Sequence, residues 1–141
     1  MNIVITRRHW ADVPDGINIF IYSLAEALLQ KGHRVTLLSG ASCNIEKVRD
    51  YFHLATYPEI LSLGTASDAG YLTVVRSWRN RGRAMIRDLD PDFIIVNGAL
   101  PFRNSSLLQR YRTTGKRESG PVETDLELHT SGIATKKAIL W

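Results

Sequence analysis

The first forty residues alternate between strand-like and helix-like patterns, and this alternation limits the fold more than any other feature. Asn2 to Thr6 is a nearly continuous apolar run, typical of a strand buried on both faces of a parallel sheet. Residues 17–31 place apolar side chains at helical spacing, and Gly32 follows as a helix-ending residue. Arg34 to Ser39 is a second β-rich run. Two strands joined by a helix predict a βαβ unit with parallel strands and a right-handed crossover.

The alternation continues along the chain to about residue 112. The apolar spacing predicts a short helix, a strand, a long helix, a strong strand and a further helix, over residues 44–52, 59–63, 73–89, 93–96 and 105–111. Pro91 should end the long helix, because its ring cannot continue one. These elements predict a single α/β domain with a Rossmann-like parallel sheet flanked by helices.

Beyond residue 112 the patterns weaken. Residues 113–121 are polar and contain Gly and Pro, as linkers do. Residues 133–141 have apolar character but no evident partner element. We therefore expect a domain over residues 1–112, followed over residues 113–141 by an irregular or poorly packed tail.

The composition narrows the class of protein. The 141 residues suit about one domain, and the net charge of +4 permits anionic partners without identifying one. Cys43 is the one cysteine, which excludes an internal disulfide and a multi-cysteine metal site. A reducing, cytoplasmic compartment fits this cysteine usage. No apolar run reaches the roughly 18 residues that a membrane span needs. We expect neither a metal nor a cofactor.

A long polar loop between the first strand and the first helix is the leading candidate site. In parallel α/β sheets, ligands bind beyond the carboxyl ends of the strands, where both this loop and the residues after 96 lie. A glycine at position 16 would let the backbone approach a phosphate, which the free amides at a helix start favour. In the alternative, Gly16 only eases the turn and Asp15 caps the helix. The predicted ligand-binding set is Arg7, Asp15, Gly16, Asn18, Asn97 and Gly98.

The same loop holds the weak candidates for catalysis. His9 and Asp12 are residue types that accept a proton from a substrate hydroxyl, although both are equally plausible as ordinary loop residues. The G-x-G-x-x-G and G-x-x-x-x-G-K-[ST] patterns are absent from the sequence, which argues against a conventional NAD enzyme or P-loop NTPase.

A basic stripe marks the predicted long helix. Its arginines recur at spacings of three, four and four residues, at Arg76, Arg79, Arg83 and Arg87. Such a face can lie on an anionic membrane surface or another anion. The simpler interpretation, which we favour, is a solvated outer helix that packs through its neighbouring apolar stripe. No nucleic-acid-binding signature accompanies the stripe, so we expect no nucleic-acid partner.

Two segments carry a family resemblance. Residues 24–38 read LAEALLQKGHRVTLL, and residues 90–98 read DPDFIIVNG. Together they resemble the amino-terminal domain of family-4 glycosyltransferases, which have the GT-B architecture and show the patterns L-A-x-x-L-x-x-x-G-H-x-V-x-L-L and x-P-D-[IV]-[IV]-x-x-H. The resemblance covers about residues 1–110. In this alignment His33 matches a family histidine that lies far from the cleft, so its expected role is structural.

The resemblance implies half of a GT-B fold, with the opening loop facing the cleft between two domains. It implies transfer of a sugar from a nucleotide-activated donor to a hydroxyl of a sugar or lipid-linked acceptor, with Gly16 near the donor diphosphate or the acceptor. The chain departs from the family at Asn97 and Gly98, where a histidine is usual. These 141 residues also hold no second Rossmann-like unit and no credible E-x7-E pair. We therefore expect a truncated transferase that is incomplete on its own, whose donor is a nucleotide-sugar bound by a domain on another chain.

Two other functions stay open at this point. The chain can be a non-catalytic binding or scaffold subunit that pairs with a separate donor-binding protein. Such a subunit can also dock peripherally at the inner membrane face through the arginine stripe. A third, weaker option is a small-anion-binding Rossmann-like domain unrelated to sugars.

Overall fold

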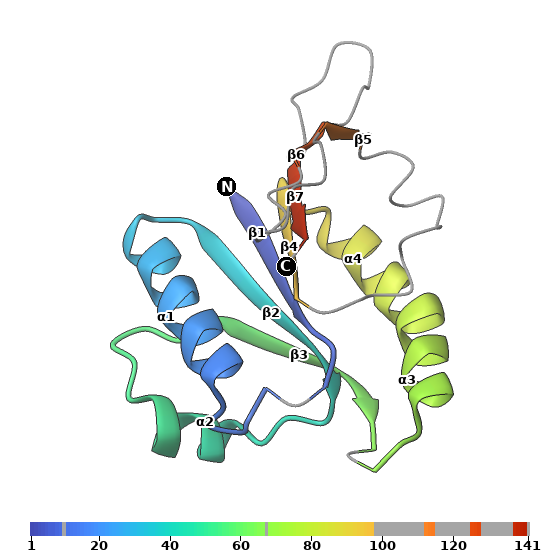
Figure 1. Cartoon of the computed structure of the whole chain (residues 1–141). Helices are drawn as coiled ribbons and strands as arrows, with labels where there is room; N and C mark the ends of the chain where they lie inside the picture. The colour runs from blue at the N-terminus through green and yellow to red at the C-terminus, as the bar shows by residue number, and fades with distance from the viewer. Residues whose placement is uncertain (10, 67, 98–111, 115–124, 128–136, 141) are drawn as a thin grey trace.

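The computed structural model describes residues 1–9, 11–66, 68–97, 112–114, 125–127 and 137–140 (Figure 1). Five parallel strands form the main sheet in the order β3-β2-β1-β4-β7. Their bounds are β1 Asn2–Arg7, β2 Arg34–Ala41, β3 Glu59–Thr65, β4 Phe93–Asn97 and β7 Lys137–Leu140. A separate antiparallel pair joins β5 (Arg112–Thr114) to β6 (Asp125–Glu127). This arrangement confirms the predicted Rossmann-like α/β fold.

Helices cover both faces of the sheet (Figure 1). Helices α1 (Gly16–Gln30) and α2 (Ile45–Phe52) lie on one face, and α3 (Tyr71–Ser77) and α4 (Arg83–Leu89) lie on the other. Side chains alternate along each strand, so the two faces build two cores. The core under α1 and α2 contains Ile3, Ile5, Ile21, Tyr22, Val35, Leu37 and Val48. The core under α3 and α4 contains Val4, Leu38, Leu63, Val74, Trp78, Ile86, Ile94 and Val96.

The long helix expected over residues 73–89 is present but contains an irregular turn. Residues Trp78–Gly82 form a π-helical turn, η1, between α3 and α4. The buried positions recur every four residues, at Val74, Trp78, Gly82 and Ile86. The apolar stripe thus continues across the π turn, which holds more than 3.6 residues, and Val74 is its buried residue in α3 whereas Val75 is half-buried.

The Asp-Pro-Asp segment joins the end of α4 to the start of β4. Asp90 adopts the left-handed conformation (φ 40°) that ends the helix, as expected from Pro91. The Asp92 carboxylate accepts a hydrogen bond from the Asn2 amide at 2.7 Å, and the Asp92 amide donates to the Asn2 carbonyl at 2.8 Å. This segment therefore aligns the amino ends of β1 and β4.

One prediction for the end of the chain is wrong, and others fall on residues that the structure does not describe. Residues 133–141 seemed to have no partner element, but Lys137–Leu140 pairs in parallel with β4 as an edge strand. Parallel strands that pair lie far apart in the sequence. The short apolar run at the end of the chain therefore did not indicate which strand it would pair with. The helix predicted over 105–111 and the position of Gly98 lie outside the described residues, and the irregular tail otherwise stays a prediction.

Candidate functional site

The candidate residues come together where β1 and β4 end. In the parallel register, Arg7 lies opposite Ser39 of β2 on one side and opposite Asn97 of β4 on the other. The loop that leaves β1 and the start of α1 therefore lie at the same edge as Asn97. This is the edge at which ligands bind in open parallel sheets.

A buried arginine organises this edge. Arg7 is 9% exposed, and its guanidinium donates to three side-chain oxygens. The acceptors are Asn18 Oδ1 at 2.8 Å, Asp15 Oδ2 at 2.7 Å and Asn97 Oδ1 at 3.3 Å. A buried guanidinium needs such partners to offset its desolvation. Arg7 thus ties the loop, α1 and β4 together. We expect it to position the site and not to present a free cation to an anion.

The start of α1 is capped by the side chain expected from the sequence. The Asp15 carboxylate accepts a hydrogen bond from the Asn18 amide at 2.7 Å. The Asn18 side chain donates in turn to the Val13 carbonyl at 2.8 Å. Gly16 lies at the exposed first position of the helix, and a methyl group added there would meet no atom within 4 Å. The backbone at Gly16 is therefore open to close approach, and ligand binding there stays a prediction.

The middle of the loop is anchored by backbone contacts that the sequence did not reveal. The Arg8 carbonyl accepts a hydrogen bond from Trp78 Nε1 at 3.2 Å and lies against Gly40. The His9 carbonyl accepts from Ser39 Oγ at 2.8 Å and from the Ala41 amide at 3.1 Å. A glycine inside a strand can indicate that another backbone approaches closely. Gly40 in β2 is the residue from which this contact could have been predicted.

Of the two catalytic candidates, Asp12 has a structural partner. Its carboxylate accepts a hydrogen bond at 2.9 Å from the amide of Asn44, the residue that caps α2. Asp12 therefore ties the opening loop to the next loop along the sheet edge. This contact favours the ordinary loop role over proton transfer for Asp12.

His9 is in the protonation state that a base requires. Burial lowers the pKa of His9 below its usual 6.5, and the charges of Arg8 and Arg7 lower it further. The imidazole is then neutral at pH 7 and can accept a proton.

We expect an NMR titration of the His9 ring to show a midpoint below 6.5. Arg8→Gln should move this midpoint upward, because it removes one repulsive charge, whereas Arg34→Gln at the opposite end of the sheet should leave it unchanged. A wild-type midpoint at or above 6.5 would contradict the burial of the ring.

The arginine stripe lies on the other face of the sheet from α1. Arg76, Arg79 and Arg87 are exposed, and Arg83 is half-buried. The helix packs through its apolar side, as the favoured interpretation predicts. Closer to the loop, the Arg8 guanidinium lies 4.5 Å from the centre of the Tyr71 ring, a cation–π contact. The anion or membrane role of the stripe stays a prediction.

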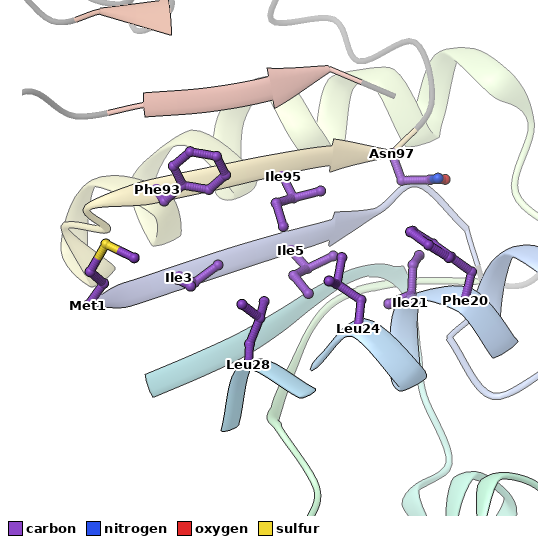
Figure 2. A pocket seen from close by; sticks show the side chains of 10 residues that line it. All are labelled: Met1, Ile3, Ile5, Phe20, Ile21, Leu24, Leu28, Phe93, Ile95 and Asn97. Carbon is purple, nitrogen blue, oxygen red and sulfur yellow. The ribbon is translucent and has the colours of Figure 1, made fainter. Parts of the chain in front are cut away.

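An open groove lies beside the site (Figure 2). It has a volume of about 380 Å³ and runs between α1 and the strands β1 and β4. Its lining is apolar except at the end formed by Asn97.

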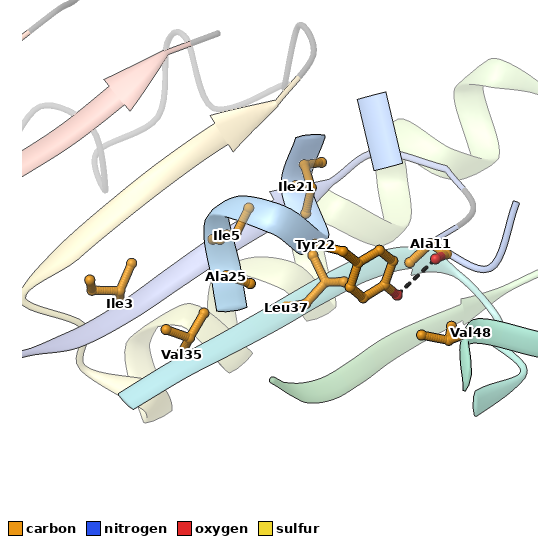
Figure 3. Packing of buried hydrophobic residues seen from close by; sticks show 9 residues of the cluster. All are labelled: Ile3, Ile5, Ala11, Ile21, Tyr22, Ala25, Val35, Leu37 and Val48. Carbon is orange, nitrogen blue, oxygen red and sulfur yellow. Dashed lines mark hydrogen bonds between the residues drawn. The ribbon is translucent and has the colours of Figure 1, made fainter. Parts of the chain in front are cut away.

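The core below the loop contains a buried phenol (Figure 3). Tyr22 Oη donates to the Ala11 carbonyl at 2.8 Å, and the Tyr22 ring lies 4.3 Å from that of Phe52. Burial raises the pKa of Tyr22 and raises that of Cys43 to about 11. Both groups are protonated at pH 7, so Cys43 is not an activated thiol.

Neither a metal centre nor a membrane helix appears in the part of the chain that the structure describes. No three His, Cys, Asp or Glu side chains cluster there in a way that could hold a metal ion. No helix among those residues is long and apolar enough to cross a bilayer. Comparison with known proteins matched the chain to no family model and to no curated protein.

Proposed function

We propose that this domain is the acceptor-side half of a glycosyltransferase that uses a nucleotide-sugar as its donor. The observation that carries the proposal is the polar edge where β1 and β4 end, at which Arg7 holds Asp15, Asn18 and Asn97 in one network. The resemblance of residues 24–38 and 90–98 to family-4 transferases supports the same reaction class.

In this proposal the exposed backbone at Gly16 contacts the donor diphosphate or the acceptor. The first amides of α1 are suited to an anion, and a glycine lets it come close. His9, neutral at pH 7, is the better-placed candidate to accept the proton of an acceptor hydroxyl. The groups that neutralise the leaving phosphates come mainly from a donor-binding domain outside these 141 residues.

Gly16→Val should abolish the binding of uridine diphosphate. The wild-type affinity should be weak, on the order of millimolar or roughly 4 kcal/mol, because one wall of the cleft is supplied by another domain. The added side chain would meet open space in the protein, so the fold should be kept and only the approach of the ligand blocked. Saturation-transfer NMR with uridine diphosphate measures the loss.

Gly70→Val is the matched control, because Gly70 also faces open space but starts α3 on the other face of the sheet. It should bind uridine diphosphate as the wild type does. Equal binding by the wild type and Gly16→Val would show that Gly16 is an ordinary turn residue.

A second candidate function is a non-catalytic subunit that pairs with a donor-binding protein. The outer side of α1 favours it, because Ile17 and Ile19 are exposed and Glu26 is the one charged residue of that helix. Co-purification from the native host distinguishes the two. A stable partner with a nucleotide pocket supports the subunit, and a lone monomer contradicts it.

A further inference from the structure

The α1 face of β4 is open in the described structure. β4 has a strand neighbour on each side, and Ile94 and Val96 are buried on its other face. Phe93 and Ile95 point to the α1 face and are only half-buried. Both side chains line the open groove beside α1 (Figure 2). An apolar inner strand normally has both faces covered, so this surface is suited to an apolar occupant.

The polarity of the groove is divided along its length (Figure 2). Ile3, Leu28 and Phe93 line one end. Asn97 is the polar residue at the other end, where Phe20 and Ile21 also line the groove. From Phe93 to Asn97 the strand spans about 13 Å, at 3.3 Å per residue. A long apolar chain with a polar group at one end matches this distribution.

Asn97 supplies a donor at the polar end. Its side chain is fixed by the bond in which Oδ1 accepts from Arg7 Nη1, and the residue is 6% exposed. That bond orients the amide, so Nδ2 is the atom left to donate, and none of the described residues accepts from it. Such an amide donor favours a ligand oxygen that can accept a hydrogen bond.

We propose that the groove binds an amphiphile whose apolar chain lies along β1 and β4 and whose oxygen-bearing head group accepts a hydrogen bond from Asn97 Nδ2. This inference rests on the proposed function, and it names the acceptor as a lipid-linked one. The head group would lie at the same sheet edge as His9 and Gly16, where sugar transfer is proposed.

The test uses the whole chain and two probes of equal length, decanoate and decylammonium, followed by NMR of the Ile3, Ile5 and Leu24 methyl groups. Decanoate should bind about tenfold more tightly, because it can accept from Asn97 whereas an ammonium group cannot. Each CH₂ group added from octanoate to decanoate should tighten binding about fourfold.

Two variants locate the chain and the head group. Leu24→Gln should weaken decanoate binding at least about tenfold, whereas Ile19→Gln, an exposed position of the same helix outside the groove, should not. Asn97→Asp keeps an oxygen for Arg7 but replaces the donor with an acceptor, so decylammonium should now bind more tightly than decanoate.

The inference is overturned if the two probes bind alike in wild type and Asn97→Asp, or if Leu24→Gln binds decanoate normally. These outcomes are separate from the proposed function, which is tested by uridine diphosphate. A chain that binds uridine diphosphate but not decanoate loses this inference alone, and a chain that binds only decanoate loses the transferase proposal.

Discussion

Gly40→Ala should destabilise the domain by about 3 kcal/mol, because the new methyl group has no room. Its carbon would lie 2.0 Å from the Arg8 carbonyl oxygen and 2.7 Å from Trp78 Nε1. The first neighbour is backbone, so relief requires the whole opening loop to move. Urea unfolding followed by circular dichroism measures the change as a lower midpoint.

Gly16→Ala is the control for this substitution. It adds the same methyl group where no atom lies within 4 Å, and it favours the helix, so it should be neutral or stabilise by up to about 1 kcal/mol. A loss of less than about 1 kcal/mol in Gly40→Ala would mean that the loop does not pack against β2 as described.

Trp78→Ala should cost about 3–5 kcal/mol, the usual range for removing a large buried aromatic side chain. The Trp78 ring is fully buried between α3, α4 and the sheet, with Val4, Leu38 and Leu63 in the same cluster. Its loss leaves a cavity in one of the two cores and also frees the Arg8 carbonyl. Thermal and urea unfolding at one pH provide the measurement.

Two further variants separate the contributions of Trp78. Trp78→Phe keeps most of the ring but removes the Nε1 donor, so it should cost about 1–3 kcal/mol. A Gly82 methyl group would meet Trp78 Cε3 at 2.7 Å, so Gly82→Ala should be less harmful in Trp78→Ala than in wild type. Additive costs would contradict the contact between Gly82 and the ring.

The order of strands and helices could be predicted from the sequence because local patterns specify it. β1, α1 and β2 have strong periodic signals, and the structure places them within about two residues of the predicted bounds. Gly32 adopts φ +80°, as the helix-ending position requires. The π turn at Trp78–Gly82 and the pairing of β7 depend on packing between distant segments, which short-range periodicity does not record.

The candidate site was predictable in location but not in detail. Topology alone placed Arg7, Asp15, Asn18 and Asn97 at one sheet edge, and they form one network there. From the sequence we predicted that Arg7 binds an anion. In the structure the Arg7 guanidinium is buried and donates its hydrogen bonds to protein oxygens. Tertiary geometry decides which hydrogen-bond donors of a side chain bond to other protein groups. The amino-acid sequence alone therefore cannot show whether a donor is left for a ligand.

The most direct test of the proposed function is a map of where uridine diphosphate binds, from the amide signals of the whole chain in an NMR titration. We predict saturable shifts confined to residues 7–18 and Asn97, with a dissociation constant on the order of millimolar. Absence of shifts at ligand concentrations on the order of tens of millimolar, or shifts centred on the arginines of residues 76–87, would contradict a donor or acceptor site at Gly16.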